Sequence, residues 1–250
     1  MIINGKYKLK LITLFLLICF FGQSAFAREY PIHNRSPQFT TNKKNTPVQN
    51  SKIRKKVSQK IYKKEVINDE DRNLALEKAQ YLFLMDQDTG EVLLEKNADK
   101  RIPPSSMTKL MTAYVMFDQI KKGKVSLTNQ CVIGKDAWKK SGSKMFLKYG
   151  DVVSIDQLIT GLLVVSGNDA SIALAEATSG SVDGFVQLMN ETGERIGLKN
   201  SHFKNPHGLN QDDHYMSLRD LSIVANSIAV DFPQYLHYFS ETDFTYQNIN

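Results

Sequence analysis

Hydrophobic residues along this chain first form short runs and later recur at helical spacing. An apolar run, Tyr81–Met85, is followed by Asp86–Gly90, whose Asp and Gly residues favour a chain reversal. A second short segment, Glu91–Glu95, comes next. This order predicts a β-hairpin.

From residue 105 onward the pattern predicts helices. In Ser105–Lys122, which follows Pro103 and Pro104, apolar residues fall on one face of a long amphipathic helix. Ser154 and Gln157 have the spacing of a capping box at the start of another helix. Shorter helical patterns occupy residues 74–76, 168–177, 183–196 and 217–230. A hairpin followed by a cluster of helices predicts a mixed α/β or α+β fold.

The N-terminus has the pattern of a secretory signal peptide. Three lysines precede the apolar run Leu11–Phe21, and Ala25-Phe26-Ala27 supplies the small residues of a cleavage site. A membrane anchor is the alternative, but a bilayer span needs about 20 apolar residues. We therefore predict a signal peptide at 1–27 and export to the periplasm or cell envelope. Cleavage leaves Cys131 as the one cysteine, which excludes an internal disulfide.

Charge divides the chain into two parts. Residues 1–66 hold 14 Lys and Arg against 2 Asp and Glu, whereas residues 67–250 hold 18 against 24. The composition of residues 28–70 is typical of a disordered basic linker, followed by a folded domain at 71–250. Export argues against nucleic acid as a partner. A peripheral contact with membrane or wall polymer and a merely solvated linker remain the two interpretations.

The pattern S-x-x-K occurs at Ser106/Lys109, Ser141/Lys144 and Ser201/Lys204. Only Ser106 and Lys109 lie on a predicted helix, one turn apart and on nearly the same face. A lysine whose pKa is lowered can remove the proton of a serine nucleophile, and a helix N-terminus can stabilise an oxyanion. The alternative is that Ser106 caps the helix and Lys109 is solvated.

A second group, Ser166-Gly167-Asn168, lies at a corner between two predicted helices. Together with Ser106/Lys109 it resembles the motifs of the penicillin-recognising serine enzymes, S-x-x-K followed by S-x-N. Residues 70–250, including Ser143–Leu147 and Asn205–Leu209, are similar to low-molecular-mass penicillin-binding proteins, the serine-type D-alanyl-D-alanine carboxypeptidases.

This resemblance implies a β-lactamase/transpeptidase-like fold, with a helical subdomain beside an antiparallel sheet. It also implies that Ser106, activated by Lys109, removes the terminal D-alanine of peptidoglycan stem peptides through an acyl-enzyme. Ser166 would relay a proton to the leaving amine, and Asn168 would bind the substrate amide and help fix Lys109. β-Lactams would acylate the same serine, and neither a metal nor an organic cofactor is implied.

The family's third motif, K-T-G, is not found after Asn168. Lys140-Ser141-Gly142 has similar letters but precedes the second motif, so we interpret it as an unrelated loop. The strand-like segment Tyr246–Asn250 ends before the expected position of that motif. We therefore expect the later strands of the sheet to lie beyond the chain end, in either a fragment or a shortened gene product.

Several other functions compete with this one. A β-lactamase of the same fold would need a deacylating base, and Glu176 comes too soon after Asn168. A D,D-endopeptidase and a truncated, non-catalytic wall-binding relative remain open. The spacing of His202, His207 and His214 with Asp213 matches no zinc pattern. We interpret Asp213, Arg219 and Asp220 as capping and surface-pair residues, and Trp138 and Cys131 as packing residues.

Overall fold

The computed structural model describes residues 69–247. The predicted signal peptide and almost all of the predicted linker lie outside these residues, as do residues 248–250. Within 69–247, no helix is long and apolar enough to cross a membrane.

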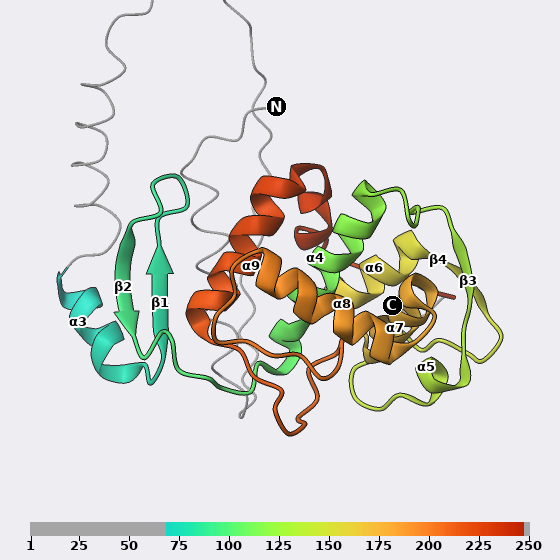
Figure 1. Ribbon diagram of the computed structural model, residues 1–250, viewed down its shortest axis with the longest axis horizontal. Coiled ribbons are helices and arrows are strands. Elements are labelled where there is room, and N and C mark those ends of the chain that lie inside the picture. The colour runs from blue at the N-terminus through green and yellow to red at the C-terminus, as the bar shows by residue number, and fades with distance from the viewer. Residues whose placement is uncertain (1–68, 248–250) are drawn as a thin grey trace, which may run out of the picture. The chain divides into compact units, whose positions relative to one another are not determined.

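The elements follow the predicted order, with one helix and a hairpin before the main cluster of helices (Figure 1). The hairpin is preceded by α3 (Asp69–Lys78), which extends the predicted helix at 74–76 in both directions. The remaining helical elements are η1 (Ser105–Met107), α4 (Thr108–Lys121), α5 (Lys135–Lys139), α6 (Ile155–Val164), α7 (Asn168–Ser179), α8 (Val182–Arg195), α9 (Leu218–Asp231) and η2 (Pro233–Phe239).

Strands β1 (Leu82–Met85) and β2 (Val92–Lys96) form the predicted antiparallel hairpin. The Asp86 carboxylate accepts hydrogen bonds from the backbone N–H groups of Asp88 and Thr89, which closes the turn between the strands. The described residues thus confirm a mixed fold in which the hairpin precedes the main cluster of helices.

A second antiparallel ribbon was not predicted. Strands β3 (Gln130–Val132) and β4 (Val152–Ser154) pair over three residues, and they enclose α5 and the loop 140–148. Each strand is only three residues long, which is too short for a period of two to be recognised in the sequence.

Helix α4 is the centre of the helical cluster, in contact with α6, α7, α8 and α9. The predicted amphipathic pattern is wrong for this helix, because every residue from Thr108 to Gln119 is buried. A helix surrounded by other helices has no solvent face, so its polar residues must find partners inside the protein. Lys109 and Thr112 are two such residues, and both are used in the site described below.

The helix starts agree with the local sequence signals. Ser154 and Gln157 form the complete capping box at the start of α6. The Ser217 side chain accepts from the N–H of Asp220 at the start of α9, as expected for a capping serine. Asp220 is buried and accepts from the N–H groups of Lys199 and Asn200, while Arg219 pairs with Glu95 and Asp99. These contacts are structural.

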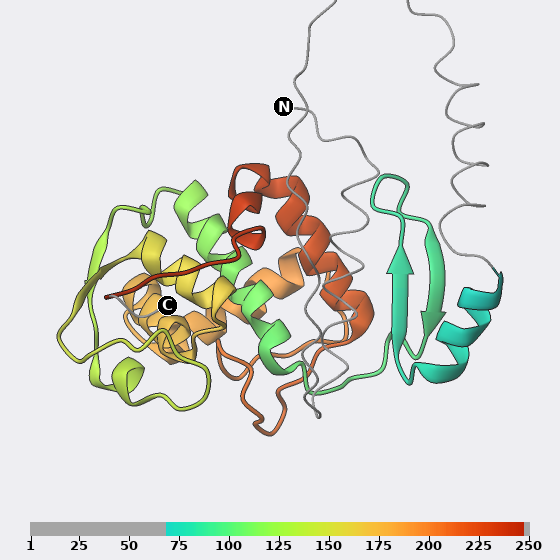
Figure 2. The same cartoon turned by 180° about the vertical axis from the view of Figure 1, so that it is seen from behind.

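The last described residues, 240–247, run from η2 toward the end of the molecule that carries β3 and β4 (Figure 2). In this segment the Tyr246 hydroxyl donates to Asp151. Two other tyrosine hydroxyls also donate to carboxylates, Tyr114 of α4 to Asp231 and Tyr238 of η2 to Asp156. The described part of the predicted final strand, Tyr246 and Gln247, belongs to none of the strands β1–β4.

Candidate active site

Ser106 and Lys109 are brought together as the spacing predicted. The Nζ atom of Lys109 lies 3.4 Å from the Oγ atom of Ser106. Ser106 does not open α4 itself but lies in η1, the tighter turn that leads into it. In the other two S-x-x-K pairs the side chains have different partners: Ser201 Oγ donates to Asp220, and Lys144 Nζ to the carbonyl of Trp138.

Lys109 is almost completely buried, with 3% of its surface exposed. Its Nζ atom also lies 2.8 Å from Asn168 Oδ1 and 2.9 Å from the carbonyl oxygen of His207. Burial lowers the pKa of Lys109 to about 8, while the negative charge of Asp169 acts in the opposite direction. Near neutral pH a useful fraction of Lys109 is therefore unprotonated and can act as a base.

Asn168, the first residue of α7, links Lys109 to the loop 140–148. Its Oδ1 atom accepts from Lys109, its Nδ2 atom donates to the Ser141 carbonyl at 2.8 Å, and its backbone N–H donates to the Ser143 carbonyl at 2.7 Å. At Gly142 a Cβ atom would lie 2.4 Å from Asn168 Nδ2, and φ is +91°. Only glycine fits this position without displacement.

Lys140-Ser141-Gly142 is therefore not the unrelated loop that we expected. It contacts the site through its backbone, although it does not supply a K-T-G strand. The contact was not predictable because a carbonyl group is present at every residue, so the letters of the segment carry no signal for it.

Asp169 fixes the other end of the same loop. Its two carboxylate oxygens accept from the N–H groups of Met145, at 3.0 Å, and Leu147, at 3.1 Å. Phe146 lies between these two residues with φ +65°, a conformation that disfavours bulky side chains. Asn168 and Asp169 together hold residues 141–147 against the N-terminus of α7.

Ser166 lies in the corner before α7, two residues from Asn168, with φ +55°. Its Oγ atom is buried and has no hydrogen-bond partner among residues 69–247. Buried hydroxyl groups nearly always have a partner in folded proteins, so an orphaned one invites a functional explanation. No hydrogen bond joins it to Ser106 or Lys109 in the described structure.

Residues 205–209 form a turn, as the resemblance implied, but the turn also belongs to the site. The carbonyl of His207 accepts from Lys109, and the carbonyl of Pro206 accepts from Thr112 Oγ1 at 2.7 Å. A Cβ atom on Gly208, where φ is +89°, would lie 1.8 Å from the Ser105 carbonyl oxygen. This close approach sets the turn directly against η1.

The histidines of this region are used in hydrogen bonds to the protein. His214 Nδ1 accepts from the N–H of Lys204, so the neutral ring carries its proton on Nε2, which donates to Thr108 Oγ1 at 2.9 Å. Burial lowers the pKa of His214 to about 4 and that of His207 to about 3. No metal-binding group of His, Cys, Asp or Glu is found in residues 69–247.

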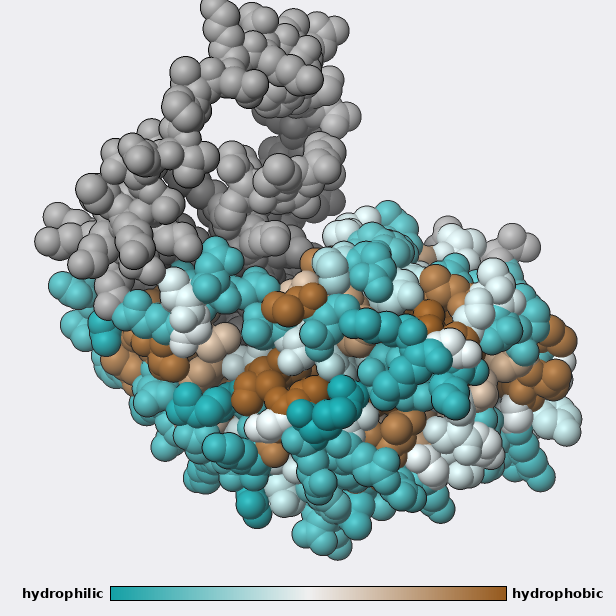
Figure 3. Space-filling model, turned by 45° about the horizontal axis from the view of Figure 1, so that its top comes forward, coloured by the Kyte–Doolittle hydropathy of each residue, from teal (hydrophilic) through white to brown (hydrophobic). Residues whose placement is uncertain are grey.

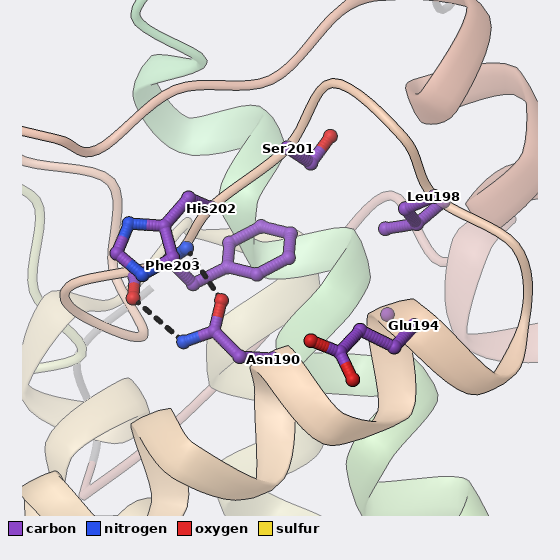
Figure 4. Close-up of a pocket in the computed structure, with 7 residues that line it drawn as sticks. Asn190, Glu194, Leu198, Ser201, His202 and Phe203 are labelled. Carbon is purple, nitrogen blue, oxygen red and sulfur yellow. Dashed lines mark hydrogen bonds between the residues drawn. The ribbon is translucent and has the colours of Figure 1, made fainter.

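A small hollow of about 70 Å³ lies elsewhere, between α8 and residues 198–203 (Figure 4). Asn190 points from α8 toward Phe203, and its side chain hydrogen-bonds both the backbone N–H and the backbone carbonyl of Phe203. Small-molecule sites usually measure about 300–1,000 Å³. This hollow is too small for such a ligand, and Ser106, Lys109, Ser166 and Asn168 do not line it.

The two residues that we interpreted as packing residues, Trp138 and Cys131, differ in burial. The interpretation is wrong for Trp138, because 44% of its surface is exposed at the end of the short helix α5. Cys131 is half-buried, and its Sγ atom donates to the Val153 carbonyl across the β3–β4 ribbon. Glu176 lies eight residues along α7 from Asn168, or about 12 Å at the helical rise, which leaves it far from the site.

The arrangement is that of an active-serine acyl-transfer enzyme. It consists of a serine on the turn before a buried helix, a buried lysine one turn later, and an asparagine that bonds this lysine. The comparisons with known proteins agree with this class. A family model described as D-alanyl-D-alanine carboxypeptidase matches residues 68–250, and the chain belongs to this family.

The chain is similar to the D-alanyl-D-alanine carboxypeptidases DacA of Haemophilus influenzae, with 43% identity over 174 residues, and DacA of Escherichia coli K12, with 42% over 177 residues. Each alignment covers 68% of this chain and 44% of the relative. The chain thus spans less than half the length of these curated relatives.

Among solved structures, penicillin binding protein 5 from Haemophilus influenzae matches with a TM-score of 0.67 and 44% identity. The match covers 68% of this chain and 51% of that protein. A serine-to-alanine mutant of the Streptomyces K15 DD-transpeptidase matches with a TM-score of 0.58 and 30% identity, covering 62% of each chain. The fold is therefore of the penicillin-binding, transpeptidase-like type.

Proposed function

We propose that this chain carries the nucleophile and base of a serine-type D-Ala-D-Ala carboxypeptidase that acts on peptidoglycan stem peptides. The observation that carries the proposal is the contact of buried Lys109 with both Ser106 Oγ and Asn168 Oδ1. In this arrangement an amine whose pKa is lowered to about 8 can take a proton from the serine hydroxyl that it contacts.

In the proposed reaction, unprotonated Lys109 removes the hydroxyl proton of Ser106. The Ser106 oxygen attacks the carbonyl carbon of the penultimate D-alanine, and the bond to the terminal D-alanine breaks. Ser166, whose hydroxyl has no protein partner in the described structure, relays the proton: it gives its own proton to the leaving amine and takes the one held by Lys109. Water then attacks the ester and regenerates Ser106, so each cycle consumes one water and releases one D-alanine.

Asn168 is the proposed substrate-binding residue. Its Oδ1 atom holds Lys109, so a substrate amide that approaches its side chain is positioned relative to the base. β-Lactams enter the same site and acylate Ser106, because their strained amide takes the place of the D-Ala-D-Ala bond. The signal-peptide pattern at 1–27 supports a location in the periplasm or cell envelope, where this substrate is found.

The test is covalent labelling with a fluorescent penicillin. The purified chain is incubated beside Ser106→Ala and the matched control Ser201→Ala, which alters another S-x-x-K serine. We expect a denaturation-resistant fluorescent band from the parent and the control and none from Ser106→Ala.

No band from the folded parent would contradict catalytic competence and favour the non-catalytic wall-binding interpretation. A band that disappears within seconds would favour a β-lactamase. Release of D-alanine from a linear pentapeptide, against cleavage of cross-linked muropeptides, separates the carboxypeptidase from the endopeptidase.

A further inference from the structure

A group of apolar side chains is exposed on β3, β4, α5 and the turn that precedes β4. Val132 and Val152 are directly paired across the ribbon and are 70% and 63% exposed. The rings of Trp138 and Tyr149, 44% and 66% exposed, lie 6.3 Å apart between centroids. Figure 3 shows hydrophobic residues at the surface on the side of the molecule that carries this ribbon in Figure 1. Contiguous exposed apolar surface often marks a binding site.

The same segment is strongly basic. Lys135, Lys139 and Lys148 are exposed, and Lys140 and Lys144 are half-buried, whereas Asp136 and Asp151 are the acidic residues between 133 and 151. We call Val132, Trp138, Tyr149 and Val152, with Lys135, Lys139 and Lys148, the aromatic–lysine surface. Its charge is complementary to an anionic ligand.

This surface is connected to the active site through one loop. Trp138 and Tyr149 stand at the two ends of the loop 140–148, and the middle of that loop is bonded to Asn168 and Asp169. The loop that joins Trp138 to Tyr149 is therefore the same loop that bonds Asn168, the residue proposed to bind the substrate amide.

We propose that the aromatic–lysine surface binds the glycan strand of peptidoglycan and the carboxylates of the stem peptides next to the one being cleaved. This inference rests on the proposed function for the identity of the polymer. Aromatic rings present apolar faces that suit the C–H faces of sugar rings, and lysines suit the peptide carboxylates.

A lipid surface fits these observations less well. Membrane-surface binding by aromatic and basic residues usually uses a long amphipathic helix, whereas α5 has five residues. Trp138 is 44% exposed, so more than half of its surface is covered by the protein, and it is not a fully exposed anchor of the kind that inserts into lipid. A face of this kind suits a rigid chain of rings that lies flat on it.

The test is co-sedimentation of the full chain with purified, protein-free sacculi. Trp138→Ala/Tyr149→Ala is compared with Val230→Ala, which removes a 64% exposed apolar side chain from α9. We expect the double variant to bind sacculi about tenfold more weakly, equivalent to loss of one modest hot spot, and the control to bind like the parent. Lys135→Gln/Lys139→Gln/Lys148→Gln should weaken binding as well, and this loss should shrink as salt is raised.

Equal binding of the parent and the double variant would overturn the proposal. The proposal would also be overturned if the two aromatic residues were needed for binding to vesicles of mixed neutral and anionic phospholipid but not for binding to sacculi. Self-association of the chain that the same substitutions abolish would overturn it as well. Labelling of Ser106 by fluorescent penicillin is measured on the same samples. If labelling is absent while sacculus binding is intact, only the proposed reaction is contradicted. If labelling is intact while binding does not depend on the two aromatic residues, only the proposed glycan surface is contradicted.

Discussion

Around Ser106, individual residues adopt conformations that cost free energy. Ser105, Phe146 and Ser166 have φ values of 49°, 65° and 55°, in the left-handed region that residues other than glycine seldom occupy. Such strain persists only where surrounding contacts determine the backbone, and it concentrates at functional sites. Substitutions of individual residues around Ser106 should therefore change activity and stability by different amounts.

Lys109 provides the first prediction. Because its pKa is about 8 and only the neutral amine is a base, the rate of Ser106 acylation by a β-lactam should rise with pH up to about 8 and then level off. Lys109→Arg should abolish this rise and nearly all acylation. Lys204→Arg, in another S-x-x-K pair, is the control. A flat profile in the parent between pH 6 and 9 would exclude Lys109 as the base.

Ser166→Ala should separate activity from stability. The substitution removes a buried hydroxyl that has no partner among the described residues, so the free energy of unfolding should stay the same or rise by up to about 1 kcal/mol. Acylation of Ser106 should fall by about 10²-fold if Ser166 transfers a proton. Ser201→Ala, which removes a hydroxyl bonded to Asp220, should instead cost about 1 kcal/mol of stability and leave acylation unchanged. A large loss of stability in Ser166→Ala would contradict this interpretation.

At the scale of elements, the site is the meeting point of η1, α4, the start of α7, the loop 140–148 and the turn 205–209. The turn reaches Lys109 through the His207 carbonyl and lies against η1 at Gly208. No single helix of the described structure contains the site, so its geometry depends on how closely these segments approach one another.

Gly208→Ala tests that approach. The Cβ atom of an alanine at this position would clash with the Ser105 carbonyl, and the left-handed backbone would add its own cost. We therefore expect the free energy of unfolding to fall by more than about 3 kcal/mol. Gly150→Ala is a matched control, because its φ of +84° is similar but nothing lies within 4 Å of the added carbon. It should cost about 1–2 kcal/mol. Urea unfolding measures both, and equal losses would show that the close contact is unimportant.

At the scale of the whole molecule, buried neutral histidines make stability depend on pH. The pKa of His214 is about 4 in the folded chain and near 6.5 when unfolded, so the unfolded state binds a proton first as pH falls. The contribution of His214 is fully present above pH 6.5 and is lost as the pH falls toward 4. His207, with a pKa of about 3, acts in the same direction.

We therefore expect His214→Gln to reduce the slope of the unfolding free energy against pH, between pH 6 and 4.5, by about 1.4 kcal/mol per pH unit, equivalent to one proton. Urea denaturation at several pH values gives this slope. An unaltered slope in His214→Gln would mean that this ring takes up its proton over the same pH range in the folded and unfolded chain.

The sequence by itself determined those features that depend on neighbours within a few positions. These include the Asp86 turn, the capping box of Ser154 and Gln157, and the approach of Lys109 to Ser106 across one turn. Each signal is a side chain whose partner lies within a turn of helix or hairpin, so short-range geometry is enough.

Tertiary structure alone decided the environment that gives these residues their chemistry. The further partners of Lys109 are 59 and 98 positions away, and one of them is a backbone carbonyl that any residue would supply. Trp138 is likewise of a residue type that is common in protein cores, but its side chain lies on the surface. Burial and long-range contacts follow from the packing of whole elements, which no local pattern encodes, and it is this burial that lowers the pKa of Lys109.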